Sequence, residues 1–68
     1  MMKTLDFTKH IRVEVMSLDG EPILDCSVKF KDQCMLTNFI KVALQNMGNC
    51  HVFLHQSGEL IDNFVMNY

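Results

Sequence analysis

The dipeptide Asp19-Gly20 constrains the fold most, because it lies between two stretches in which apolar and polar residues alternate. Asp-Gly suits both central positions of a type I′ turn, a common two-residue connection in β-hairpins. The turn sets the register, so Val13 is predicted to lie opposite Cys26, and one face of the hairpin becomes wholly apolar. The other face is polar and is predicted to carry His10, Arg12, Glu14, Asp25, Ser27 and Lys29.

Two details of this hairpin concern its polar face and its edge. In the predicted register Glu14 faces Asp25 directly, and two opposed carboxylates repel each other unless Arg12 or Lys29 lies diagonally close. Pro22 has no backbone N–H to donate, so it marks part of the second strand as an edge of the sheet.

Between Asp32 and Met47 the spacing of apolar residues changes from two to between three and four. This period predicts an amphipathic helix, with Asp32 as its N-cap and Gly48-Asn49 as its C-terminal stop. A helix about 22 Å long matches a strand of six or seven residues, so it can cover one face of a small sheet. The predicted buried stripe comprises Leu36, Phe39, Ile40, Ala43, Leu44 and Met47.

The last quarter of the chain contains two further strand-like runs, Cys50 to His55 and Glu59 to Asn67, on either side of Ser57-Gly58. A two-residue loop there predicts a tight hairpin that is apolar on both faces. The core face is expected to hold Val52, Leu54, Ile61 and Val65. The other face holds His51, Phe53, His55, Leu60, Asp62, Phe64 and Met66. This face is placed outside because it contains two histidines and an aspartate, which would need polar partners if they were buried. A slip of one residue would exchange the two faces.

The elements together predict a single α+β domain over residues 1–68, in the order strand, strand, helix, strand, strand. A four-stranded, mainly antiparallel sheet with the helix packed on one face satisfies both hairpins. The other face of the sheet then stays uncovered in a monomer. The segment 1–9 either extends the first strand or lies on that bare face, and the order of strands between the hairpins is left open.

Charge and hydropathy argue against several functional classes. The formal net charge is −2, and the six lysines and arginines are scattered, which argues against nucleic-acid binding. No apolar run approaches the roughly 20 residues that cross a bilayer. The start of the chain, Met1-Met2-Lys3, is followed by charged Asp6 and Lys9 rather than by the apolar core of a signal peptide. Three cysteines without a CxxC motif fit reduced thiols in the cytoplasm.

No pattern of catalytic or metal-binding residues stands out. His51 and His55 lie on one side of a strand but about 13 Å apart along it, too far to bind one metal ion together. Cys34, at the predicted helix start, could pair with a histidine as a nucleophile, but the sequence provides no oxyanion-stabilising group around it. The expectation is therefore a protein without enzymatic activity, bound metal or cofactor.

The apolar residues left on the outer face of the second hairpin form the candidate partner-binding set. Monomers rarely expose a contiguous apolar patch of this kind. The set comprises Phe53, Leu60, Phe64, Met66 and Tyr68, flanked by His51 and His55. We expect a small non-enzymatic protein-binding module, an inhibitor or adaptor of the phage or mobile-element anti-defence type, that occludes a surface of a larger protein. Its expected location is the cytoplasm, that of the host if the chain is encoded by a phage.

Three alternatives stay open at this stage. The same patch could close a symmetric homodimer, sheet to sheet or edge to edge. The aromatic residues could stack on single-stranded nucleic acid, although such a face calls for interleaved lysine and arginine rather than histidine and aspartate. Finally, the amino-terminal segment or a shifted register could bury the patch within the monomer.

Overall fold

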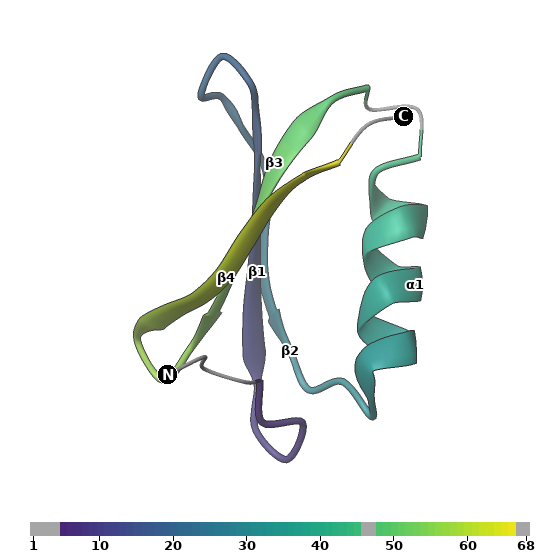
Figure 1. The fold of residues 1–68 in the computed structure, drawn as a ribbon, viewed down its shortest axis with the longest axis vertical. Helices are drawn as coiled ribbons and strands as arrows, with labels where there is room; N and C mark the ends of the chain where they lie inside the picture. The colour runs from purple at the N-terminus through teal and green to yellow at the C-terminus, as the bar shows by residue number, and fades with distance from the viewer. Residues whose placement is uncertain (1–4, 46–47, 67–68) are drawn as a thin grey trace.

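The computed structural model describes residues 5–45 and 48–66 as one sheet and one helix. The elements are β1 (Ile11–Ser17), β2 (Pro22–Val28), α1 (Gln33–Ala43), β3 (Cys50–Gln56) and β4 (Glu59–Met66). Figure 1 shows α1 alone on one side of the four strands. The predicted α+β class, the order of elements and the single helix on one face are confirmed.

The two hairpins join through their first strands. The order in the sheet is β2-β1-β3-β4, and every neighbouring pair is antiparallel. β1 and β3 are therefore the central strands, with Arg12 opposite His55 and Val15 opposite Val52. The chain leaves the edge strand β2, passes through α1 and enters β3 on the far side of β1.

The first hairpin pairs in the predicted register. Val13 lies opposite Cys26, and the same register holds along β1 from Ile11 to Val15. The apolar side chains of β1 are fully buried beneath α1, and the alternate residues face away from the helix. The sheet thus has a covered face and an uncovered one.

The connection in this hairpin differs from the predicted type I′ turn. The Gly20 N–H donates to the Ser17 carbonyl at 2.9 Å, and Gly20 has a φ of 89° whereas Asp19 keeps a negative φ. The loop therefore has three residues, Leu18-Asp19-Gly20, and ends in a left-handed glycine. A bulge in β2 leaves Ile23 without a partner on β1. The extra loop residue and the bulge cancel, which is why the register was predicted correctly from the wrong turn.

The second hairpin shows the opposite outcome. Its two-residue loop is as predicted, and both Ser57 (φ 55°) and Gly58 (φ 77°) are left-handed. His55 then lies opposite Leu60, but Ile61 is bulged, so that Leu54 pairs with Asp62. Every later residue of β4 is shifted by one position relative to the prediction. The side chains beyond the bulge therefore change faces.

The core lies between α1 and the central strands. Its fully or nearly fully buried members are Ile11, Val13, Val15, Phe30, Leu36, Ile40, Leu44, Cys50, Val52 and Leu54. Of the predicted helix stripe, Phe39 and Ala43 are half-buried, and Met47 lies outside the described residues. Phe39 meets Phe30 edge to face, with ring centroids 5.3 Å apart.

The start of the helix agrees with the prediction, whereas its end does not. The Asp32 carboxylate accepts a hydrogen bond from the Met35 N–H at 2.9 Å, which confirms Asp32 as the N-cap. The helix ends at Ala43 with Leu44 as its C-cap, before the predicted stop at Gly48-Asn49. Gly48 nevertheless adopts a left-handed φ of 73°, as a chain-reversing glycine does.

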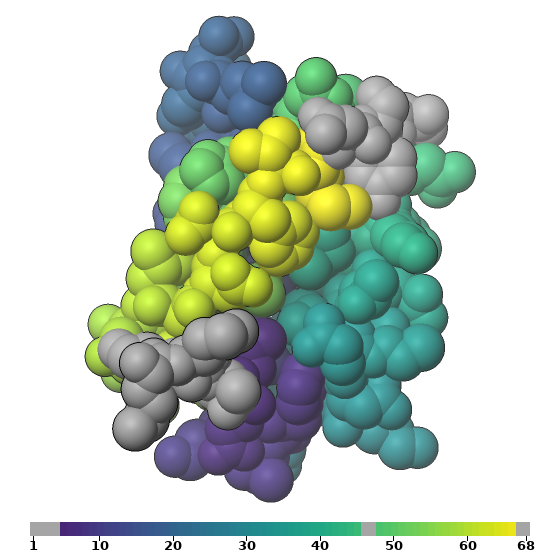
Figure 2. All heavy atoms as spheres, viewed as in Figure 1, coloured from purple at the N-terminus to yellow at the C-terminus, as the bar shows by residue number. Residues whose placement is uncertain are grey.

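Residues 5–10 neither extend β1 nor lie on the uncovered face. Leu5 and Phe7 pack against the core, and Figure 2 shows this segment in purple against the lower end of α1. The side chain of Gln56 holds the segment in place. Its amide accepts from the Asp6 N–H at 2.8 Å and donates to the carbonyls of Asp6 and His10. Within the described residues, one face of the sheet is left without cover.

The two X-Gly turns should respond differently to asparagine. Asparagine tolerates the left-handed conformation better than serine does, so Ser57→Asn is expected to raise the free energy of unfolding by roughly 0.5 kcal/mol. Asp19→Asn should change it by a few tenths at most, because residue 19 has a negative φ. Urea unfolding measures both, with the midpoint shifting at constant slope. Equal gains at the two positions would contradict the assigned turns.

Candidate functional site

The uncovered side of the sheet, called the outer face below, has a row of three rings at its centre. β3 places His51, Phe53 and His55 on this side, because its alternate residues are buried beneath α1. The rings of His51 and Phe53 stack with centroids 4.2 Å apart, and those of Phe53 and His55 lie 6.5 Å apart at 28°. Since β3 is a central strand, the row runs through the middle of the face.

Apolar side chains of the neighbouring strands border this row. Leu60 and Val65 of β4 lie opposite His55 and His51 and are 45% and 49% exposed. Met16 of β1 lies opposite His51 on the other side and is half-buried. Phe53 itself is half-buried, with Glu14 and Asn63 directly opposite it on the two neighbouring strands, so the apolar side chains lie diagonally around it.

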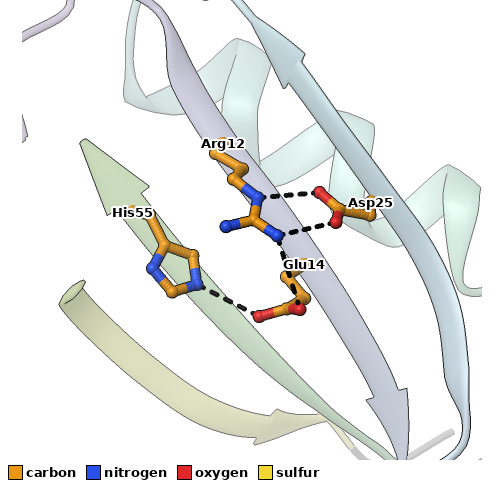
Figure 3. A network of polar contacts seen from close by, with 4 residues as sticks. All are labelled: Arg12, Glu14, Asp25 and His55. Atoms are coloured by element: carbon orange, nitrogen blue, oxygen red, sulfur yellow. Dashed lines mark hydrogen bonds and ion pairs between the residues drawn. The ribbon is translucent and has the colours of Figure 1, made fainter. Parts of the chain in front are cut away.

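A charged network occupies the half of the outer face formed by β1 and β2. Arg12 donates from Nε and Nη2 to the two carboxylate oxygens of Asp25, at 2.9 and 2.7 Å (Figure 3). The same Nη2 lies 3.7 Å from Glu14 Oε2. Arg12 thus offsets the repulsion between the opposed carboxylates of Glu14 and Asp25, as expected from the sequence. Its hydrogen bond holds the pKa of Asp25 below the ordinary aspartate value.

Hydrogen bonds orient both histidines of the row. His55 Nε2 lies 3.2 Å from Glu14 Oε1, and His51 Nε2 lies 3.2 Å from Asn63 Oδ1. These contacts tie the two ends of the row to strands on opposite sides of β3. Phe53 is held between two fixed rings, so its orientation is set before any partner arrives.

The structure brings together four of the seven residues predicted to bind a partner. Phe53, Leu60, His51 and His55 share the outer face. Phe64 and Met66, by contrast, pack against the core on the helix side, which contradicts their expected position. There they border an apolar hollow of about 120 Å³ beneath α1. Tyr68 lies outside the described residues.

The bulge at Ile61 accounts for this error and for the residues that were missed. Val65, expected in the core, is instead exposed on the outer face. The sequence contained a sign of this bulge. Leu60 and Ile61 are both apolar and Asp62 and Asn63 are both polar, so the strict alternation of apolar and polar residues is broken there. Arg12, Glu14 and Asp25 were recognised as polar, but nothing in the sequence placed β1 beside β3. Their contact with the histidine row could not be predicted.

The remaining reactive groups do not converge. Among the described residues, no three histidine, cysteine or carboxylate side chains are arranged to hold a metal ion. Burial raises the pKa of the Cys26 and Cys50 thiols, which disfavours the nucleophilic thiolate. Cys34 is exposed and 3.7 Å from Asn38 Nδ2. Within the described residues, no helix has the length and apolar character needed to span a membrane.

Truncating the two phenylalanines of the second hairpin should distinguish its faces. Phe64→Ala is expected to lower the free energy of unfolding by roughly 2–3 kcal/mol, because Phe64 packs against the core. Phe53→Ala should cost less than about 1 kcal/mol, since it removes contacts only on the outer face. Chemical denaturation of both variants tests this order. The reverse order would mean that the β4 register is wrong.

The Arg12–Asp25 ion pair should make the melting temperature depend on pH in the acidic range. A carboxylate whose pKa is lowered by folding stabilises the protein above its unfolded pKa, and that contribution disappears as pH falls through the folded pKa. Asp25→Asn should therefore lower the melting temperature near neutral pH and flatten its decline below about pH 4. Ser27→Ala, on the same strand and face, should keep the wild-type slope. Parallel curves for all three proteins would contradict the pairing.

Comparison with known proteins does not add a functional assignment. No protein-family model matches the chain, and neither the curated proteins nor the solved structures provide a match. A functional interpretation must therefore come from the geometry of the outer face.

Proposed function

We propose that the chain is a small protein-binding module whose contact surface is the outer face, with Phe53 as the anchor. The observation that supports this most directly is the setting of Phe53, uncovered on a central strand and stacked between two hydrogen-bonded histidines. Leu60 and Val65 extend the apolar area to one side. Interfaces typically combine such a rigid aromatic centre with a polar rim that excludes water. The Arg12 network supplies that rim on the other side.

The size of the face favours a larger partner over a second copy. Four strands about 4.8 Å apart and seven residues long make a face of roughly 450 Å² in projection. A stable interface of standard size takes about 800 Å² from each partner. The accessible area of a face covered with side chains exceeds its projection, so two flat copies would reach the standard size only by burying nearly the whole face. A larger protein that also contacts the rim of the sheet can bury the same area without covering the whole face.

The edges of the sheet argue for recognition through side chains rather than by strand addition. Both edge strands contain a bulge, at Ile23 in β2 and at Ile61 in β4, and Pro22 also removes a donor from β2. Bulges and proline at edges disfavour pairing with another strand. The edge-to-edge homodimer is therefore the weaker of the two dimer hypotheses.

The charges on the outer face favour a protein over a nucleic acid. Arg12 is engaged with Asp25 and lies close to Glu14, so its charge is largely compensated. Binding to phosphate backbones depends on uncompensated lysine and arginine. We infer that the partner offers an apolar surface for Phe53 with polar groups around it. Occlusion of such a surface on a larger cytoplasmic protein, as phage- and mobile-element-encoded inhibitors do, is the proposed activity.

Site-specific crosslinking tests the proposal. A photoreactive phenylalanine analogue at position 53, expressed in the native host, is expected to capture one defined protein. The same analogue at Val42, which is 71% exposed on α1 and faces away from the sheet, should not capture it. With the captured protein purified, Phe53→Ala should weaken binding at least tenfold, or about 1.4 kcal/mol, as expected of an anchor residue.

Other outcomes of the same experiment would overturn the proposal. A crosslinked product that contains only this chain would identify the outer face as a homodimer interface. Crosslinks to RNA or DNA would favour the stacking alternative. Equal capture from positions 53 and 42, or unchanged affinity of Phe53→Ala, would show that the outer face is not the contact surface. Val42→Ala is the matched control for loss of an exposed apolar side chain.

A further inference from the structure

A cleft of about 280 Å³ lies at one end of the outer face, where β1 and β2 meet the turn between β3 and β4. Its lining consists almost wholly of groups that can donate hydrogen bonds. They include His10, Arg12, Ser27, His55, Ser57 and Gly58. No carboxylate side chain belongs to the lining. Asp25 binds the far edge of the Arg12 guanidinium, and Glu14 lies between Arg12 and His55, 3.7 Å from Arg12 Nη2 and 3.2 Å from His55 Nε2 (Figure 3). Such a set of donors is suited to an oxyanion.

Arg12 is oriented toward the cleft by its own ion pair. Asp25 binds the Nε and Nη2 edge of the guanidinium, which leaves Nη1 without a hydrogen bond in the described part of the chain. Figure 3 shows this third nitrogen on the side of the guanidinium that faces His55. Because Asp25 holds the plane of the guanidinium, the free N–H groups point in a fixed direction. A guanidinium held in this way matches the oxygens of carboxylate and phosphate groups.

We propose that this cleft is a binding site for a small oxyanion, a carboxylate or a phosphate, held by Arg12 Nη1 and by the imidazoles of His10 and His55. The proposal goes beyond the protein-binding function, because the cleft lies beside the area around Phe53 and needs no protein partner. The hydroxyls of Ser27 and Ser57 provide further donors at its margin.

Nearby carboxylates limit the net attraction for an anion. Asp25 and Glu14 offset the charge of Arg12, Glu14 also lies 3.2 Å from His55 Nε2, and Glu59 follows the turn on β4. Binding is therefore expected to be weak and to depend on directed hydrogen bonds from the guanidinium and the imidazoles rather than on excess positive charge.

An amide NMR titration of the full chain tests the site. Sodium acetate is the first probe, because it stays fully ionised between about pH 6 and pH 8, and inorganic phosphate is the second. Saturable shifts are expected at the amides of Ser27, Ser57 and Gly58, with a dissociation constant on the order of millimolar. Sodium chloride at matched ionic strength controls for screening.

Histidine variants make the test specific. The double variant His10→Gln, His55→Gln should weaken acetate binding at least fivefold. His51→Gln is the matched control, because His51 lies on the same strand and face but does not line the cleft, and it should bind acetate as the wild type does. Binding of acetate alone would identify a carboxylate site, and binding of both probes a general oxyanion site. Shifts that never saturate, or full binding by the double variant, would overturn the proposal.

Discussion

The antiparallel pairing of β1 with β3 is the interaction on which the rest of the structure depends. Each hairpin alone has two strands, too few to be stable in water without further packing. Their union places the buried residues of β1 beside Val52 and Leu54, and this continuous apolar surface is what α1 covers. On the opposite side the same pairing brings Glu14 to His55. The core and the outer face thus arise from one set of backbone hydrogen bonds.

Much of the fold could be predicted from local patterns, for identifiable reasons. The helix follows from its apolar period and from the N-cap Asp32, both of which act within a few residues. The first hairpin follows from alternation, and its register was right although its turn was not. Here the burial of Val13 and its neighbours evidently outweighs the preference of Asp19-Gly20 for a two-residue loop. Burial of a whole face fixes a register more strongly than one turn does.

The candidate site was only partly predictable, because it depends on features without a local signal. The strand order depends on contacts between residues far apart in the sequence, so the position of Arg12 opposite His55 could not be predicted. In β3 the positions of the histidines were correctly inferred from the cost of burying them. In β4 the same reasoning failed, because one bulged residue, Ile61, reverses the faces of everything after it. Phe64 and Met66 therefore pack against the core instead of lying on the outer face.

The strict alternation of β3 separates two physical constraints within seven residues. Val52 and Leu54 are held by the packing beneath α1, whereas His51, Phe53 and His55 contact only their neighbours on the open side. Substitutions at these three positions are expected to leave the backbone ladder and the core intact. The side chains of the open face can therefore change in single steps at little cost in stability, whereas each change at Val52 or Leu54 requires the core to repack.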